Sequence, residues 1–201
     1  MARNKRQSKH VVARKPRLLV VADGKTEINY FRGLFKEYSK IYEHYEVEFK
    51  GNMINTYEIY NLIKISGYKY DYIFALSDKD NANNKDDVFN NFCYMDKCYD
   101  NLITGYTNPC FEFWLLLHSE YRSVEISTKE LIVKFKKQIG KNYKSNNNIF
   151  SYFIDNLEVA VTNSEKLKLF WKDNNKSIAK CNPITNIHEI VKYIIQINND
   201  L

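Results

Sequence analysis

The stretch Arg17-Leu18-Leu19-Val20-Val21-Ala22-Asp23-Gly24-Lys25-Thr26-Glu27 decides the predicted fold. Its first six residues form a short apolar run that contains two β-branched valines, which is typical of a strand buried on both faces. The run ends at Asp23-Gly24, and apolar side chains then recur at helical spacing from about Glu27 to Tyr42. This order of strand, turn and helix predicts the start of a parallel β-α-β unit.

The same alternation continues along the chain. Three further short segments have the composition and spacing of strands: 45–50, 70–76 and 102–107. Helical spacing covers three segments between and after them: 56–66, 88–99 and 109–119. Strands that alternate with helices predict an α/β fold in which a mainly parallel sheet is flanked by helices.

The character of the sequence changes after about residue 122. Lysine- and asparagine-rich helices follow, separated by polar loops such as 141–148; they are 128–139, 149–157 and 163–172. We therefore expect four parts along the chain. These are a basic flexible tail at 1–16, an α/β core at 17–121, a helical C-terminal insertion or appendage at 122–181, and a C-terminal helix at 182–201 that packs on the core.

Two Asn-Pro pairs have the chemistry of helix starts. Asn108 is expected to cap a helix whose first turn contains Pro109, because a proline there loses no hydrogen bond. Near the second pair, Asn186 and Glu189 have the spacing of a capping box for the last helix.

Length and composition predict a globular protein of the cytoplasm. A chain of 201 residues that is 44% hydrophobic can bury one substantial core. Its apolar segments are all shorter than the roughly 18 residues of a membrane span, and the N-terminus lacks the apolar part of a signal peptide. We expect no membrane partner. Four cysteines without CxxC spacing predict free thiols: Cys93, Cys98, Cys110 and Cys181.

The positive charge is concentrated at the N-terminus. Seven of the 30 Lys and Arg residues lie within 1–17, which contains no acid, so the remaining chain has 23 basic residues against 24 acidic ones. Such a tail can bind phosphates by releasing counterions. The alternative is a disordered leader that only adds solubility.

Acidic residues follow two of the predicted strands. Asp23 and Glu27 come after the first, and Asp78 and Asp80 come after the strand at 70–76. Ligands bind at the carboxyl ends of parallel strands, and Mg²⁺ or Mn²⁺ takes carboxylate oxygens there. Without a cation, clustered carboxylates repel one another. An ordinary turn at Asp23-Gly24 and a solvated loop at 78–80 are the alternatives.

Glu112 is the one acid in an otherwise apolar segment, so we expect it to be paired, near a metal or at a rim. A structural salt bridge is its alternative. His118 in the same segment is expected to be a core or edge histidine.

Four other residues are candidates for binding phosphate. Asn186 and His188 lie at the predicted start of the last helix, and Lys25 and Lys79 flank the acids. Local bonds at a helix start are the favoured explanation of His188, and surface solvation explains the two lysines equally well.

Four blocks of the chain resemble the RloB-like family: LLVVADGKTEINYF at 18–31, DKD at 78–80, NPCFEFWLLLH at 108–118 and NPITNIHE at 182–189. That family is similar to the Toprim domains of topoisomerases, primases and overcoming-lysogenization-defect nucleases, and its genes are associated with restriction-modification and other anti-phage loci. The resemblance implies a Toprim-like sheet and a divalent metal held by Asp78 and Asp80. It also implies an acid in the first block that acts as metal ligand or general acid/base. The family usually has Glu before Gly24, where this chain has the shorter Asp23.

These observations predict a Mg²⁺- or Mn²⁺-dependent endonuclease of anti-phage defence. Asp78, Asp80 and one of Asp23 or Glu27 are expected to hold the metal, and Glu112 to complete the acidic rim. The expected substrate is DNA or RNA, tRNA included, and an ATPase or restriction subunit is a candidate partner. The alternatives are a hydrolase of nucleotides or cyclic-oligonucleotide messengers, and an inactive nucleic-acid-binding subunit.

Overall fold

A computed structural model of the protein describes residues 14–51, 55–80, 85–139 and 148–201. Its centre is a five-stranded sheet with the order β2-β1-β3-β4-β5. Four strands are parallel: β1 (Arg17–Ala22), β2 (Glu46–Lys50), β3 (Tyr72–Asp78) and β4 (Leu102–Asn108). The short strand β5 (Ile184–Thr185), which the sequence pattern did not predict, pairs antiparallel with β4. The predicted α/β fold with a mainly parallel sheet is confirmed.

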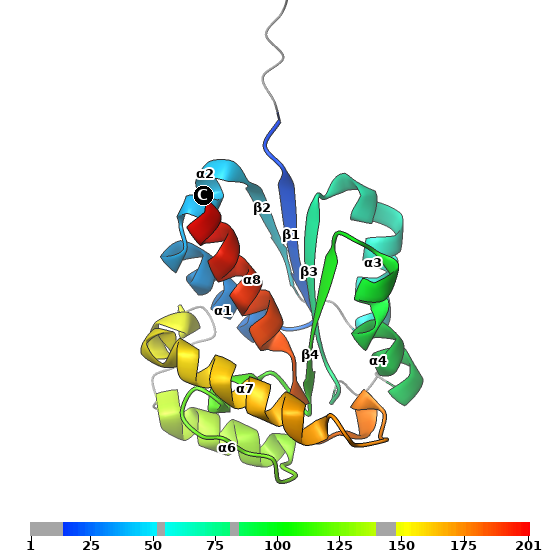
Figure 1. The fold of residues 1–201 in the computed structure, drawn as a ribbon, viewed down its shortest axis with the longest axis vertical. Coiled ribbons are helices and arrows are strands. Elements are labelled where there is room, and N and C mark those ends of the chain that lie inside the picture. Colours follow the sequence, from blue (N-terminus) through cyan, green and yellow to red (C-terminus); the bar gives the residue numbers. More distant parts are fainter. Residues whose placement is uncertain (1–13, 52–54, 81–84, 140–147) are drawn as a thin grey trace, which may run out of the picture.

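Helices cover both faces of this sheet (Figure 1). Side chains alternate along β1, so Leu18 and Val20 face one core and Leu19 and Val21 face the other. The first core is covered by α1 (Lys25–Glu37) and α8 (Ile187–Asp200). The second is covered by α3 (Thr56–Ser66) and α4 (Asp86–Cys93). Burial on both faces explains why the central strands are continuous apolar runs.

The segment that follows β4 packs against the first core. It contains α5 (Glu112–Leu116), α6 (Thr128–Ile139) and α7 (Leu157–Trp171). Apolar side chains of α6 and α7 join the same cluster as those of α1 and α8; they are Leu131, Phe135, Ile139, Leu157, Ala160 and Leu167. In Figure 1, α6 and α7 lie toward the carboxyl ends of the strands. The helical insertion therefore shares the core of the sheet.

Several predicted helices differ from the observed ones. The first ends at Glu37 and is followed by the short α2 (Lys40–His44). The helix predicted over 149–157 is wrong, because two 3₁₀ turns occupy it, η3 (Ile149–Tyr152) and η4 (Ile154–Asn156). Three more 3₁₀ turns connect the elements: η1 (Gly67–Lys69), η2 (Met95–Cys98) and η5 (Ile178–Lys180).

Neither predicted asparagine makes a capping bond with its side chain, although Asn186 does occupy the N-cap position of the last helix. Asn108 ends β4 and donates to the carbonyls of Ala179 and Cys181, while α5 begins only at Glu112. Asn186 precedes α8, but its side chain makes no capping bond. Long-range bonds to other backbone groups satisfy these amides instead. The peptide bonds Asn108-Pro109 and Asn182-Pro183 are both cis.

A capping box is found at α6 instead. The backbone N–H and the hydroxyl of Ser127 donate to the Glu130 carboxylate at 2.9 Å and 2.8 Å, and the Glu130 N–H donates back to the Ser127 hydroxyl at 3.3 Å. This reciprocal pair fixes where α6 begins.

The N-terminal tail falls mostly outside the described residues, as do 81–84 and 140–147 of the predicted polar loops. Arg14, the first described residue, forms an ion pair with Asp71 at 3.3 Å. All four cysteines are free, as predicted. Among the described residues, every helix is too short or too polar to cross a membrane.

Candidate metal centre

Asp23 and Asp78 meet because β1 and β3 are parallel neighbours. Ala22 is paired with Leu76 in the register of the two strands, so both chains leave the sheet at the same edge. The Asp23 Oδ2 atom accepts hydrogen bonds from the Ser77 hydroxyl at 3.0 Å and from the Asp78 backbone N–H at 3.2 Å. The sheet thus fixes the orientation of the first carboxylate.

Glu27 reaches the same point from the first turn of α1. Its side chain is buried, although it carries a carboxyl group. The carboxyl group lies over Gly24, where a β-carbon would be 2.6 Å from the Glu27 Cδ atom. Glycine at this position therefore leaves the space that the Glu27 carboxyl group occupies.

The three carboxyl groups of Asp23, Glu27 and Asp78 form one cluster. Each offers an oxygen atom, and these atoms all lie within 4.8 Å of one another. Asp78 is held by the Phe111 backbone N–H, which donates to its Oδ2 atom at 2.9 Å. Two buried oxygens, Asp23 Oδ1 and Glu27 Oε2, have no hydrogen-bond partner within the described ranges of the chain. In the described part of the chain this is the one group of acids, histidines or cysteines with the spacing of metal ligands.

The pKa values of the three carboxyl groups show that holding them together without a cation is unfavourable. Burial raises the pKa of Asp23 to about 6 and that of Glu27 to about 8. Burial also raises the pKa of Asp78 well above its ordinary value, and repulsion by Glu27 and Asp23 adds to the effect. Hard oxygen donors with unpaired lone pairs are the ligands that Mg²⁺ and Mn²⁺ prefer. The residues present therefore fit a divalent cation, whose charge would offset their repulsion.

The structure separates Asp80 from this cluster. Asp80 lies at the exposed rim, and its Oδ2 atom accepts a hydrogen bond from the Thr128 hydroxyl at 2.7 Å. Its negative charge still contributes to the raised pKa of Asp23. Of the four acids expected to hold the metal, three therefore meet and Asp80 points to the start of α6.

Glu112, the first residue of α5, lies close to the cluster. Its charge contributes to the raised pKa of both Glu27 and Asp78. The side chain is half-buried, and no salt bridge to it is found among the described residues. The structure therefore places Glu112 beside the acids, at the rim.

The two lysines next to the acids differ in their surroundings. Lys25 is exposed at the first position of α1. Lys79 forms an ion pair with Asp86 at 3.0 Å.

Asn186 and His188 are buried rather than presented at an open helix start. The Asn186 amide accepts from the Tyr106 N–H at 2.7 Å and donates to the Thr104 carbonyl at 2.8 Å, which fastens α8 to β4. His188 Nδ1 is 2.7 Å from the Ser164 hydroxyl, and burial lowers the His188 pKa to about 4. Both side chains thus have structural bonds in this fold.

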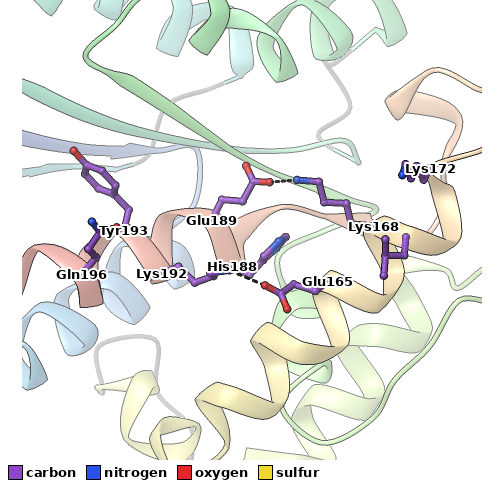
Figure 2. Close-up of a pocket in the computed structure, with 9 residues that line it drawn as sticks. Glu165, Lys168, Lys172, His188, Glu189, Lys192, Tyr193 and Gln196 are labelled. Carbon is purple, nitrogen blue, oxygen red and sulfur yellow. Dashed lines mark hydrogen bonds and ion pairs between the residues drawn. The ribbon is translucent and has the colours of Figure 1, made fainter. Parts of the chain in front are cut away.

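His188 also lines a groove of about 800 Å³ between α7 and α8. Figure 2 shows two ion pairs across this groove, Lys168 with Glu189 and Lys192 with Glu165. Each of these lysines is thus neutralised by a glutamate.

His118 is a core residue, as expected. Its Nε2 atom is 3.1 Å from the Tyr30 hydroxyl, and its Nδ1 atom is 3.1 Å from the Trp114 carbonyl. Burial lowers its pKa to about 4, so the ring is neutral near pH 7.

Three supporting residues were missed by sequence analysis. Ser77 binds Asp23, Thr56 binds Ser77 with 2.6 Å between the two hydroxyl oxygens, and Thr128 binds Asp80. Ser77 directly precedes Asp78, so its position at the strand end was the available signal. Thr56 and Thr128 lie far away in sequence, and nothing local marks them.

The family model described as RloB-like protein matches residues 18–194, which is most of the chain and includes all the clustered acids. The chain belongs to the RloB-like family. Searches of curated proteins and of solved structures each gave no significant match. In this RloB-like chain, all the candidate residues therefore lie in the part of the sequence that the family shares.

Proposed function

We propose that this RloB-like protein is a divalent-metal-dependent endonuclease that hydrolyses phosphodiester bonds of nucleic acid. The observation that carries the proposal is the cluster of Asp23, Glu27 and Asp78, in which ligand oxygens lie within 4.8 Å of one another. Two of the buried oxygens have no hydrogen-bond partner among the residues that the structure describes. A buried, unpaired carboxylate is costly, and a metal site explains why three acids are held together.

Asp23, Glu27 and Asp78 would hold Mg²⁺ or Mn²⁺. When bound, the cation would act as a Lewis acid toward the phosphate and lower the pKa of a water molecule. The chain's own groups position the site. Ser77 and the Asp78 N–H orient Asp23, and the Phe111 N–H orients Asp78. Glu112 is the nearby half-buried acid that can accept a proton from an attacking water.

The distribution of charge supports a polyanionic substrate. Residues 17–121 contain 11 basic and 16 acidic residues, whereas 122–181 contain 12 basic and only 6 acidic ones. By sequence, the segment that forms most of the sheet is thus net acidic and the helical insertion is net basic. A cationic surface next to an acidic metal site is what a phosphate backbone requires.

Helix α6 begins next to the site, and its exposed lysines lie further along it. Thr128, in the first turn of α6, contacts Asp80. Lys129, Lys136 and Lys137 are exposed on this helix, at spacings that place them on one face, and they form no ion pair with a described residue. We propose that this face carries the phosphate backbone of the substrate.

The biological setting follows from the family. The association of RloB-like genes with restriction and anti-phage loci favours damage to DNA or RNA, tRNA included, as the outcome. A partner such as an ATPase or restriction subunit would then control the activity. Cleavage within the cytoplasm is part of the proposal.

The proposal is tested with purified protein and panels of DNA and RNA, with Mn²⁺, with Mg²⁺ and with EDTA. We expect metal-dependent cleavage that is lost in Asp78→Asn, which keeps the size of the side chain and an oxygen acceptor for the Phe111 N–H. The matched control Asp71→Asn changes an exposed acid elsewhere and should leave cleavage intact.

Two results would contradict the proposal. Equal cleavage by the wild type and Asp78→Asn would show that the activity belongs to a contaminant. Hydrolysis of nucleotides or cyclic oligonucleotides with all polymers intact would favour the small-molecule hydrolase instead.

A further inference from the structure

A second groove, of about 560 Å³, lies between α3 and the segment formed by α4 and η2. We infer that it holds an unpaired base of a single-stranded nucleic acid, next to the metal centre. This inference rests on the proposed function and specifies its substrate class. It is carried by the lining of the groove and by its connection to Asp23.

The lining is aromatic and uncharged. Tyr57, Tyr60, Tyr94 and Tyr99 line the groove above an apolar floor that includes Phe92 and Met95. Tyr57 and Tyr94 are 60% and 46% exposed, so much of each side chain is open to a ligand. No described lining residue carries a charge, which favours the face of a base over a phosphate.

Two of these tyrosines are arranged for stacking. The rings of Tyr57 and Tyr60 are within 18° of parallel, with centroids 6.5 Å apart. Both belong to the first two turns of α3, so the helix holds their rings in register. Lys97 Nζ lies 4.6 Å from the centre of the Tyr94 ring. It supplies a positive charge near the nucleic-acid strand whose base would enter the groove.

A polar side chain at the groove can read the edge of a base. Asn91 presents its amide among the lining residues. Amide side chains form hydrogen bonds with the edges of bases. A groove with aromatic faces and a few polar groups thus matches a flat ligand with a polar edge.

The groove is connected to the metal centre by hydrogen bonds. Thr56, which lines the groove, lies 2.6 Å from the Ser77 hydroxyl, and Ser77 donates to Asp23 at 3.0 Å. Two hydrogen bonds therefore separate the groove from a ligand oxygen of the cluster. If the tyrosines hold a base, the backbone of the same nucleic-acid strand would lie at the carboxylates of the cluster.

The substrate class follows from the stacking geometry. In a duplex both faces of each base are covered by neighbouring base pairs, so tyrosine rings cannot reach them unless the base leaves the stack. A single strand exposes its faces without that cost. The groove therefore selects single-stranded segments, including RNA loops, over continuous duplex.

The inference is tested by binding, in EDTA, so that cleavage plays no part. Fluorescein-labelled oligothymidylate and oligouridylate are titrated with protein, and anisotropy is measured. The double variant Tyr57→Ala, Tyr60→Ala should bind at least about tenfold more weakly. Tyr57→Phe, Tyr60→Phe keeps both rings and should bind like the wild type. Tyr68→Ala changes a tyrosine that is 82% exposed outside the groove and should have no effect.

Cys98 provides an independent readout. It lines the groove and is the exposed one of the four cysteines, while Cys93, Cys110 and Cys181 are buried. A bound single strand should slow the alkylation of Cys98 by a maleimide, whereas a blunt duplex should not. This measurement reports occupancy of the groove in the unmutated protein.

The outcomes separate this inference from the proposed function. Two results would contradict base binding in the groove even if the protein cleaves nucleic acid. One is wild-type affinity in the double alanine variant, and the other is no protection of Cys98 by either oligonucleotide. If free nucleotides protect Cys98 as strongly as oligonucleotides do, the ligand of the groove is a mononucleotide, and the inference of a single-stranded polymer is wrong. Tyrosine-dependent binding without any cleavage would support the groove while the nuclease proposal fails.

Discussion

Gly24 and Glu27 occupy one shared space at the metal centre. A β-carbon on Gly24 would be 2.6 Å from Glu27 Cδ and closer still to its Oε2 atom, which cannot occur without movement of the carboxyl group. Gly24 has φ −110° and ψ 161°, an extended conformation that alanine also adopts. Glycine is thus required here for space and not for backbone freedom.

Gly24→Ala should therefore act on the metal site while leaving the fold intact. The displaced Glu27 carboxylate no longer completes the cluster, and we expect Mn²⁺ affinity to fall by about tenfold to a hundredfold. Calorimetric titration measures the affinity. Gly67→Ala is the matched control, because a β-carbon there would meet its nearest neighbours at 3.4 Å, an ordinary contact. Unchanged Mn²⁺ affinity in Gly24→Ala would show that Glu27 is not a ligand.

Asp78 and Asp80 should differ in their importance, although both follow β3. Asp78 lies in the cluster, whereas Asp80 bonds to Thr128 at 2.7 Å. We expect Asp78→Asn to abolish Mn²⁺ binding and Asp80→Asn to weaken it by less than about tenfold. Titration calorimetry on the two variants tests this order. If Asp80→Asn is the more damaging substitution, the cation lies nearer the rim than the cluster indicates.

Without metal, the stability of the protein should decrease as the pH rises. The Glu27 pKa is about 8 in the fold against an ordinary 4.5, so over that interval the folded chain keeps a proton that the unfolded chain has released. The free energy of unfolding then falls with increasing pH, and Asp23 and Asp78 act in the same direction.

Glu27→Gln removes one titrating group, so in EDTA it should reduce this decrease and be more stable than the wild type at pH 8 by about 1 kcal/mol or more. Urea unfolding at pH 5 and pH 8 measures the difference. Mn²⁺ should stabilise the wild type more at pH 8 than at pH 6, because its ligands must be ionised. Parallel pH profiles for the two proteins would show that Glu27 does not titrate abnormally.

The lysine face of α6 should set the salt dependence of nucleic-acid binding. Replacing Lys129, Lys136 and Lys137 by Gln removes up to three phosphate contacts, which should lower the slope of log affinity against log salt by about 2 for a single strand. The control triple Lys36→Gln, Lys40→Gln, Lys64→Gln removes the same charge from exposed positions elsewhere. If the slope of log affinity against log salt is the same for the two triple variants, the overall positive charge of the protein sets the salt dependence, and α6 is not a specific phosphate-binding site.

Much of the fold was predictable because its signals are local. The apolar runs at 17–22 and 70–76 mark buried strands, and β1 and β3 lie there with small shifts of their ends. The helix at 56–66 was predicted with its observed bounds because apolar side chains recur there at helical spacing up to Gly67, and in the structure Asn55 caps it. The predictions at 108–109, 149–157 and 186–189 were wrong because those segments are shaped by contacts with distant chain, such as the bonds of Asn186 to β4.

The sequence by itself determined which residues end the strands, because side-chain periodicity and turn chemistry depend only on near neighbours. It therefore predicted that four acids gather at one edge of the sheet: Asp23, Glu27, Asp78 and Asp80. Only the tertiary structure decided that Glu27 is buried over Gly24, that Thr128 holds Asp80 away from the cluster, and that Thr56 connects a tyrosine groove to Asp23. Such pairs depend on how whole helices pack against the sheet, and no local pattern specifies that packing.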